Sequence, residues 1–228
     1  VEVQRFKSFA PYAAYYLSPT MYLKLKDLTD VDVVHAHHYN ALPALLAALA
    51  KRRNHIPLII TTHYHPFGGT SFRTALWKLY KHLGEIELKN ADKIIALNNN
   101  ERNLLLNTFK IPPSKIQVIP NGVSDTTEAP QRTDIGKNIL FVGRLEKYKG
   151  VHHVLSIFPN IKKIIPEAQL VIVGDGPYRK ELLSTTQRMH VSGVLFLGTI
   201  SDLKLASYYK SAKLFVLLSE YEAFPVSL

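Results

Sequence analysis

The sequence predicts an α/β protein with parallel β-sheets, and two observations support this class. First, short apolar runs recur along the 228 residues from position 31 onward, with an amphipathic segment between most of them. Second, these runs are rich in Val, Ile and Leu without alternating polar residues, which is typical of strands buried on both faces. Helices are then expected on each side of the sheets, in a doubly wound arrangement.

The expected elements follow in chain order. The strands are 31–34, 57–61, 93–96, 117–119, 139–142, 170–173, 194–197 and 214–218. The helices are 42–53, 71–88, 100–108, 152–165, 178–190 and 201–211. The helix 71–88 carries a predicted core stripe of Phe72, Leu76, Leu79 and Leu83. Aromatic and basic side chains off this stripe, Trp77 and Tyr80 among them, suit either an anionic membrane surface or a solvated helix face.

The alternation breaks once, at 125–137, a segment without apolar pattern that we interpret as a linker. The predicted domains are therefore 1–124 and 138–228. Two Rossmann-like domains joined in this way would face each other across a cleft at the carboxyl ends of their strands, where such folds bind ligands. The first residues do not resemble the start of such a domain, so we expect its beginning to be missing.

Composition narrows the class of protein. A hydrophobic content of 46% and a charged content of 20% are those of a folded globular chain. The absence of cysteine excludes disulfides and thiolate metal sites, and it favours a reducing compartment such as the cytoplasm. No apolar stretch reaches the roughly 20 residues of a membrane span. The net charge of +10 suits an anionic partner or a solvated basic surface.

Two glycine-rich turns follow neighbouring predicted strands. The strand 139–142 leads into a turn that runs from Gly143 to Gly150 and then into a helix. Glycines allow backbone N–H groups to approach a ligand, and a helix N-terminus favours anions. Within this turn, Arg144 offers a planar fork of donors and Lys149 a point charge, which suits a diphosphate. A basic surface turn is the alternative.

The strand 170–173 ends in Gly174, Asp175 and Gly176, followed by Pro177. Taken alone, this is an ordinary turn with a proline at the start of a helix. Its expected position on the same rim as the first turn gives it functional interest.

Histidines mark the first domain. His63 ends a predicted strand, where a side chain that titrates near neutrality can act as a proton donor or polarise a substrate, although structural histidines also occur there. The pairs His35 with His37 and His63 with His65 have the H-x-H spacing of zinc ligands, but no acidic ligand is evident nearby.

Seven motifs in chain order identify a resemblance. They are D-V-V-H-A-H, I-P-L-I-I-T-T-H, I-P-N-G-V, F-V-G-R-L-E-K-Y-K-G, V-I-V-G-D-G-P, F-L-G and S-E-Y-E-A-F-P. Together they resemble the retaining nucleotide-sugar glycosyltransferases of family 4, also called glycosyl transferases group 1, which have the GT-B fold. The resemblance covers nearly the whole chain from position 31.

The resemblance assigns roles to the marked residues. Arg144 and Lys149 are similar to the pair that holds the donor diphosphate, beside Gly143 and the turn 174–176. His63 is similar to a histidine near the donor sugar, contributed by the acceptor domain. Asn121 matches a loop at the domain boundary.

The last motif corresponds to the family's sugar-binding loop. Glu222 is similar to the first acid of its E-x7-E motif, near the transferred sugar. Ala223, Phe224 and Pro225 fall where the family offers backbone N–H groups. The second acid would lie at position 230, and the family's opening strand and closing helix are also missing, so both domains are expected to be incomplete.

The implied activity is transfer of a sugar from a nucleotide diphosphate donor, such as a UDP or GDP sugar, with retention of configuration. No metal and no cofactor is expected besides this donor substrate. The acceptor stays open between a lipid-linked molecule and a glycan. We expect a cytoplasmic protein, with contact to the cytoplasmic membrane face as one option, and no nucleic-acid partner. Two alternatives are a zinc-dependent hydrolase that uses the H-x-H histidines and a non-catalytic module that binds nucleotides or polyanions.

Overall fold

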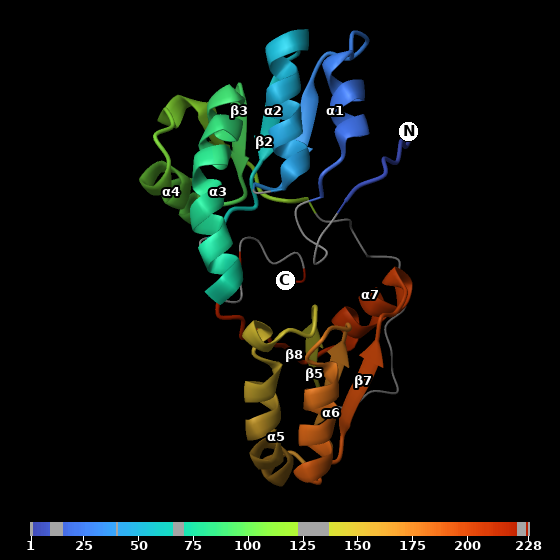
Figure 1. Cartoon of the computed structure of the whole chain (residues 1–228). Coiled ribbons are helices and arrows are strands. Elements are labelled where there is room, and N and C mark those ends of the chain that lie inside the picture. Colours follow the sequence, from blue (N-terminus) through green and yellow to red (C-terminus); the bar gives the residue numbers. More distant parts are fainter. Residues whose placement is uncertain are drawn as a thin grey trace. The chain divides into compact units, whose positions relative to one another are not determined.

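The computed structural model of the chain describes residues 2–9, 16–39, 41–65, 71–122, 137–222 and 227, with only the backbone described at 71–79. The chain divides into two compact units, Val1–Asn121 and Gly122–Leu228 (Figure 1). Apart from Lys137, the predicted linker lies outside the described residues. None of the described helices is long and apolar enough to cross a membrane.

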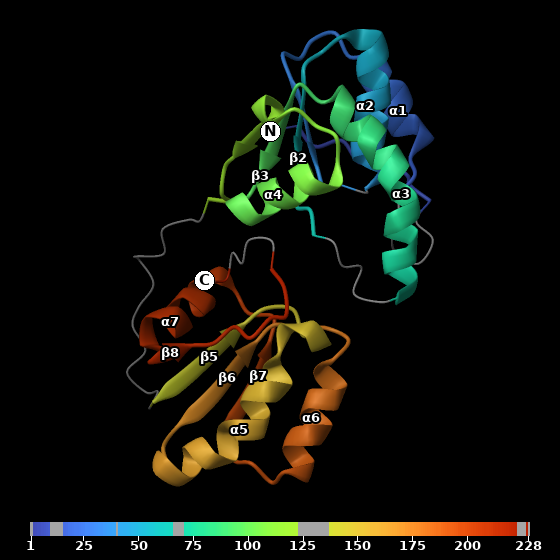
Figure 2. The same ribbon diagram turned by 90° about the vertical axis from the view of Figure 1, so that its left-hand side faces the viewer.

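The first unit contains a four-stranded parallel sheet in the order β1-β2-β3-β4. Its strands are β1 (Val34–His37), β2 (Leu58–Thr61), β3 (Lys93–Ala96) and β4 (Ile116–Val118). Its helices are α1 (Pro19–Lys26), α2 (Leu42–Asn54), α3 (Ser71–Asn90) and α4 (Asn99–Thr108). Since right-handed crossovers joining sequential neighbours share a face, α2, α3 and α4 cover the same side of the sheet. Figure 2 shows α2 and α3 together on one side of β2 and β3.

Two details of this unit differ from the sequence prediction. The first strand is displaced from 31–34 to 34–37, because Val34 pairs with Leu58 and His37 pairs with Thr61. The described crossover helices also share one face of the sheet, whereas we expected helices on both.

The predicted core stripe of α3 is wrong where its side chains are described. Leu83 is 44% exposed, and Tyr80, expected off the stripe, is only 5% exposed. The buried face of α3 runs instead through Tyr80, Gly84, Glu87 and Leu88. Gly84 makes this possible, because a Cβ there would lie 2.2 Å from the ring of Tyr39.

The second unit contains a parallel sheet in the order β7-β6-β5-β8. Its strands are β5 (Asn138–Val142), β6 (Gln169–Val173), β7 (Val194–Gly198) and β8 (Leu214–Phe215). Its helices are α5 (Val151–Ile164), α6 (Arg179–Arg188) and α7 (Asp202–Ser211). The expected last strand is shorter than predicted, although Val216 N–H still donates to the Leu140 carbonyl over 2.9 Å.

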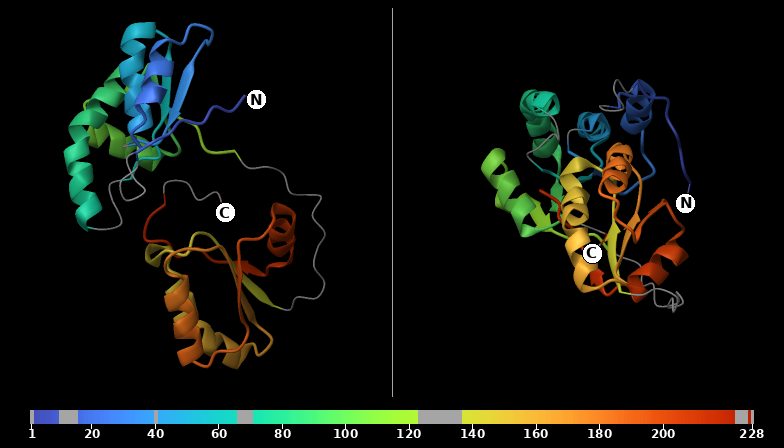
Figure 3. Two further views of the ribbon diagram at one scale, coloured as in Figure 1. Left: turned by 45° about the vertical axis from the view of Figure 1, so that its right-hand side comes forward. Right: turned by 90° about the horizontal axis from the view of Figure 1, so that it is seen from below.

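The two faces of this second sheet are covered by different helices. One face carries Phe141, Leu170 and Ile172, which pack with buried residues of α5 and α6. The other carries Leu140 and Val171, which pack with α7. Figure 1 and the left view of Figure 3 show α5 and α6 on one side of the strands and α7 on the other. The predicted doubly wound arrangement is therefore confirmed here, and the strand order reverses between β5 and β8.

Candidate functional site

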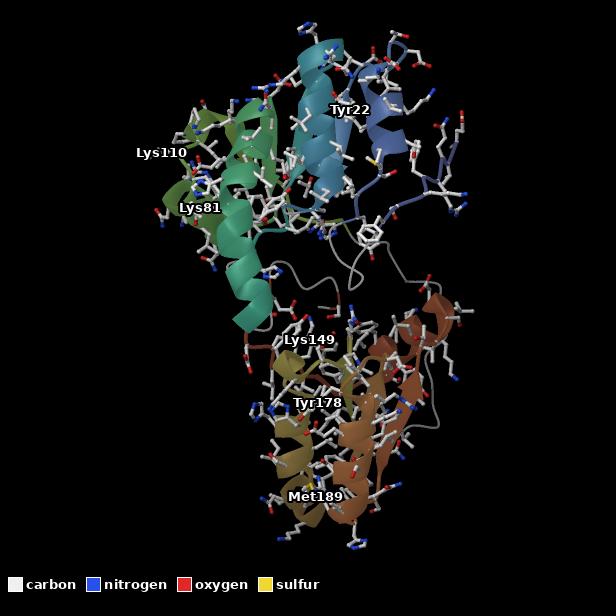
Figure 4. All side chains as sticks on the ribbon, viewed as in Figure 1. Tyr22, Lys81, Lys110, Lys149, Tyr178 and Met189 are labelled. Carbon is white, nitrogen blue, oxygen red and sulfur yellow. The ribbon has the colours of Figure 1, made fainter. Side chains whose placement is uncertain are left out.

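The reversal of strand order defines a candidate site in the second unit. Loops that leave the carboxyl ends of two strands in opposite directions separate at such a point, and open α/β sheets bind ligands there. β5 runs into the segment that holds Arg144 and Lys149, and β8 runs into the segment that ends at Glu222. Arg144, Lys149 and Glu222 therefore lie in segments that leave the carboxyl ends of adjacent strands. Figure 4 shows Lys149 at this end of the unit, with Tyr178 nearby and Met189 at the opposite end.

Backbone hydrogen bonds join the two glycine-rich turns. Leu145 N–H donates to the carbonyl of Asp175 over 2.9 Å, and Tyr178 N–H donates to the Leu145 carbonyl over 3.0 Å. Asp175 also accepts the N–H of Gly176 through its side chain at 2.7 Å, which tightens the second turn. Both turns are thus held as one surface on which backbone groups have fixed directions.

Two glycines allow this close approach. A Cβ on Gly174 would stand 2.0 Å from the Gly143 carbonyl oxygen, and one on Gly176 would stand 2.4 Å from the Leu145 carbonyl oxygen. Gly174 also has a φ of +124°, which L side chains rarely adopt. Any larger residue at either position would separate the turns.

The segment after β8 packs against the start of α5. Glu220 N–H donates to the Tyr148 carbonyl over 2.8 Å. The rings of Tyr148 and Tyr221 stack with centroids 4.5 Å apart and planes 9° apart. Gly150, with a φ of +74°, is the N-cap residue before α5, and a Cβ on it would come within 2.1 Å of the Leu218 carbonyl oxygen. The N-terminus of α5, which attracts anions, therefore opens beside this segment.

The two cations of the site each form an ion pair with a carboxylate. Lys149 forms an ion pair with Glu222, and their side chains are 15% and 23% exposed. Arg144 pairs with Glu146, with Nε and Oε1 3.1 Å apart, and its side chain is 70% exposed. An arriving anion would compete with both carboxylates. The sequence predicts both cations as site residues, but it does not indicate which carboxylate each one pairs with.

In the first unit, His63 lies two residues after the end of β2 and has a φ of +47°. Its ring stacks on that of His38, with centroids 4.5 Å apart. Its Nε2 lies 3.3 Å from Nδ1 of His37, a distance that allows a hydrogen bond. Burial, together with the neighbouring His38 and His37, lowers the pKa of His63 to about 4. Its ring is therefore neutral at physiological pH, with one nitrogen a hydrogen-bond donor and the other an acceptor.

The zinc alternative finds no site in the part of the chain that the structure describes. No group of three or more His, Cys, Asp or Glu side chains is arranged there to hold a metal ion. His35 and His37 do lie together, with ring centroids 4.5 Å apart, but Nε2 of His35 is engaged by the Thr61 hydroxyl at 2.8 Å.

Other predicted site residues are placed only in part. Asn121 is the last residue of the first unit and is half-buried. Ala223, Phe224 and Pro225 lie outside the described residues. The stack of Tyr148 on Tyr221 was missed, although an aromatic residue directly before each of the two paired residues is visible in the sequence.

Comparisons with known proteins identify the relatives of this chain. Residues 1–127 match the sequence profile of Glycosyltransferase Family 4, and residues 125–228 match that of Glycosyl transferases group 1. The chain is 29% identical over 222 residues to the UDP-Gal:alpha-D-GlcNAc-diphosphoundecaprenol alpha-1,3-galactosyltransferase of Escherichia coli, covering 90% of this chain and 56% of that protein. It is 28% identical over 220 residues to the alpha-monoglucosyldiacylglycerol synthase of Streptococcus pneumoniae, covering 88% and 49%.

A solved structure shows the same fold. The lipopolysaccharide outer core galactosyltransferase in its apo form superposes with a TM-score of 0.61 at 22% identity, over 92% of this chain and 56% of that one. The chain spans about half the length of the curated relatives it matches.

Proposed function

Because this chain belongs to glycosyltransferase family 4 and has the GT-B fold, we propose that it acts in the transfer of a sugar from a nucleotide diphosphate donor to an acceptor. The observation that carries the proposal is the convergence of Arg144, Lys149 and the N-terminus of α5 at the reversal of strand order in the second unit. Two cations and a helix N-terminus suit a diphosphate better than a neutral ligand.

In this proposal the second unit binds the donor. The diphosphate displaces the carboxylates of Glu146 and Glu222 from Arg144 and Lys149. As the bond between the sugar and the diphosphate breaks, negative charge grows on the leaving nucleotide, and the two cations stabilise it. They supply the positive charge that a divalent metal would otherwise provide, so we propose a metal-independent reaction without a further cofactor. Glu222, once released from Lys149, faces the sugar.

The proposed role of His63 follows from its protonation state. A neutral imidazole can accept a hydrogen bond from a sugar hydroxyl or donate one to it without adding a charge. We propose that His63 contacts the donor sugar. Retention of configuration is part of the proposal, and the anomeric configuration of the product, read by NMR, tests it. A product with the opposite anomeric configuration would refute retention but would leave the proposed donor binding unaffected.

The proposed acceptor is lipid-linked or a glycan. Two of the relatives are named for acceptors or products that carry a lipid, diphosphoundecaprenol in one and diacylglycerol in the other. The net charge of +10 supports contact with an anionic membrane face. We therefore propose work in the cytoplasm, at the membrane face when the acceptor is lipid-linked. Flotation with vesicles of anionic and of neutral lipid tests the membrane contact.

Calorimetry with UDP, GDP and ADP tests the donor site. We expect one of the three to bind the parent chain and to lose affinity in Lys149→Ala. Lys163→Ala is the control, because Lys163 is an exposed lysine in the last turn of α5, at the end of that helix away from Lys149. Equal affinities in the two variants would refute the assignment. Binding without any sugar transfer would favour the non-catalytic nucleotide-binding module.

A further inference from the structure

A buried carboxylate in the first unit reaches the loop that carries His63. Glu101 is 2% exposed and lies in the first turn of α4, whose N-cap residue Asn98 accepts its N–H over 2.8 Å. Its carboxylate accepts three hydrogen bonds. The donors are the N–H of Leu97 at 2.6 Å, the hydroxyl of Thr62 at 2.6 Å and the N–H of Tyr64 at 2.5 Å.

Two of these three donors flank His63 in the chain. Thr62 immediately precedes it and Tyr64 immediately follows it, and both bond to the same oxygen, Oε1 of Glu101. A backbone hydrogen bond also fixes this loop, because Thr62 N–H donates to the Ile95 carbonyl over 3.1 Å. One carboxylate on α4 therefore accepts hydrogen bonds from both chain neighbours of the predicted sugar-binding histidine.

The backbone conformation of His63 explains why hydrogen bonds on both sides of it are needed. Its φ of +47° lies in the left-handed region, which few residues other than glycine adopt. A conformation of this kind persists only where the surrounding structure imposes it. The bonds from Thr62 and Tyr64 to Glu101 fix the chain on both sides of the unusual residue.

Capping of α4 alone does not account for this arrangement. A glutamate in the first turn of a helix often accepts backbone N–H groups at that helix's own start, as Glu101 does from Leu97. The other two bonds go to the loop after β2, in a different part of the chain. They contribute nothing to the cap of α4 and act on the His63 loop.

We propose that Glu101 is a positioning residue that fixes the imidazole of His63 at the carboxyl end of β2. The functional weight of this position rests on the proposed function, in which His63 contacts the donor sugar. The position itself does not depend on any activity. Without the carboxylate, the backbone of His63 relaxes from the left-handed region and the ring leaves its contacts with His37 and His38.

The test compares three variants of the chain. Glu101→Ala removes all acceptors. Glu101→Gln is the conservative variant, because its amide oxygen can still accept from Thr62 and Tyr64, and only the bond from Leu97 N–H is lost. Asn98→Ala is the control, since it weakens the cap of α4 but leaves the carboxylate in place.

Two NMR measurements report on the loop without sugar transfer. In Glu101→Ala we expect the amide of Tyr64 to exchange with solvent about tenfold faster or more, because its charged acceptor is gone. We also expect the pKa of His63 to rise from about 4 toward 6.5. The titratable groups around it are His37 and His38 at the end of β1, with Glu101 facing its loop from α4. Glu101→Gln should keep both readouts near the parent, and Asn98→Ala should lower the melting temperature without moving either.

A transfer assay with each variant separates the two proposals. We expect Glu101→Ala to lower kcat by about 10²-fold, the order expected when a reacting group is misplaced, with KM for the donor little changed. Parent-like His63 and Tyr64 signals in Glu101→Ala, at a loss of thermal stability equal to that of Asn98→Ala, would overturn the positioning role. A displaced His63 with an unchanged transfer rate would support the positioning role and overturn the proposed role of His63 in transfer.

Discussion

The contact between the two glycine-rich turns should make the second unit intolerant of a side chain at Gly174. At Gly174, alanine would meet the Gly143 carbonyl oxygen at 2.0 Å and would have to adopt a φ of +124°. The unfavourable backbone conformation costs about 1–2 kcal/mol. Forcing a methyl group into a packed contact adds about 1–3 kcal/mol. We therefore expect Gly174→Ala to lower the free energy of unfolding of the second unit by about 2–5 kcal/mol.

Gly198 provides the matched control in the same unit. It has a φ of +66°, but nothing lies within 4 Å of the place where its Cβ would stand. Gly198→Ala should therefore cost only the backbone term, about 1–2 kcal/mol. Scanning calorimetry of both variants measures the difference, since each kcal/mol moves the melting temperature of a domain of about 100 residues by about 4–8 °C. Melting of Gly174→Ala at or above the temperature of Gly198→Ala would show that the two turns are not in contact at Gly174.

Three further predictions concern charge. Because the pKa of His63 is lowered to about 4, stability should fall as pH drops from 6.5 through 4, and His63→Asn should weaken that fall in acid melts. Burial raises the pKa of Glu87 to about 8, so stability should decline as pH rises from 4.5 through 8. The melting temperature of Glu87→Gln relative to that of the parent should then rise between pH 5 and pH 9. A difference in melting temperature that does not change with pH would contradict the burial of a neutral carboxyl group. Glu222→Gln, which frees Lys149, should tighten nucleoside diphosphate binding about 2–5-fold by calorimetry, and weaker binding would contradict competition between carboxylate and phosphate.

The fold was predictable because apolar runs and strand pairing agree for most elements. The strand at 93–96 matches β3, and the helix at 42–53 differs from α2 by one residue. The first strand was displaced by three positions because Val31, Val33 and Val34 look equally suited to a strand. Only the pairing of Val34 with Leu58 decides where it begins.

The face of α3 could not be read from its own sequence. The leucine spacing favours Leu83 as a core residue, but Leu83 is exposed and Tyr80 is buried instead. The Tyr80 hydroxyl donates to the Glu87 carboxyl group over 3.0 Å. Gly84 then admits the ring of Tyr39, which comes from the loop after β1. These are tertiary contacts that no local periodicity contains.

The sequence predicted which segments form the candidate site, but not which carboxylates pair with its cations. Parallel strands bring their following loops to one edge, so the turns after β5 and β6 had to meet. The carboxylate partners of Arg144 and Lys149 are not determined by that rule, since either acid side chain could equally face solvent. The three bonds accepted by Glu101 were missed for the same reason, because a glutamate at a helix start is ordinary in sequence.

The pairing of β8 with β5 sets an order of events during synthesis. Ile139 pairs with Leu214, and Lys149 and Glu222 are 73 positions apart. At a synthesis rate of about 5–20 residues per second, Glu222 is added about 4–15 s after Lys149. During that time one edge of β5 has no neighbouring strand in this sheet, and such an edge can pair with another chain. Until β8 docks, the nascent second unit therefore exposes this strand edge, and only then can Glu222 pair with Lys149.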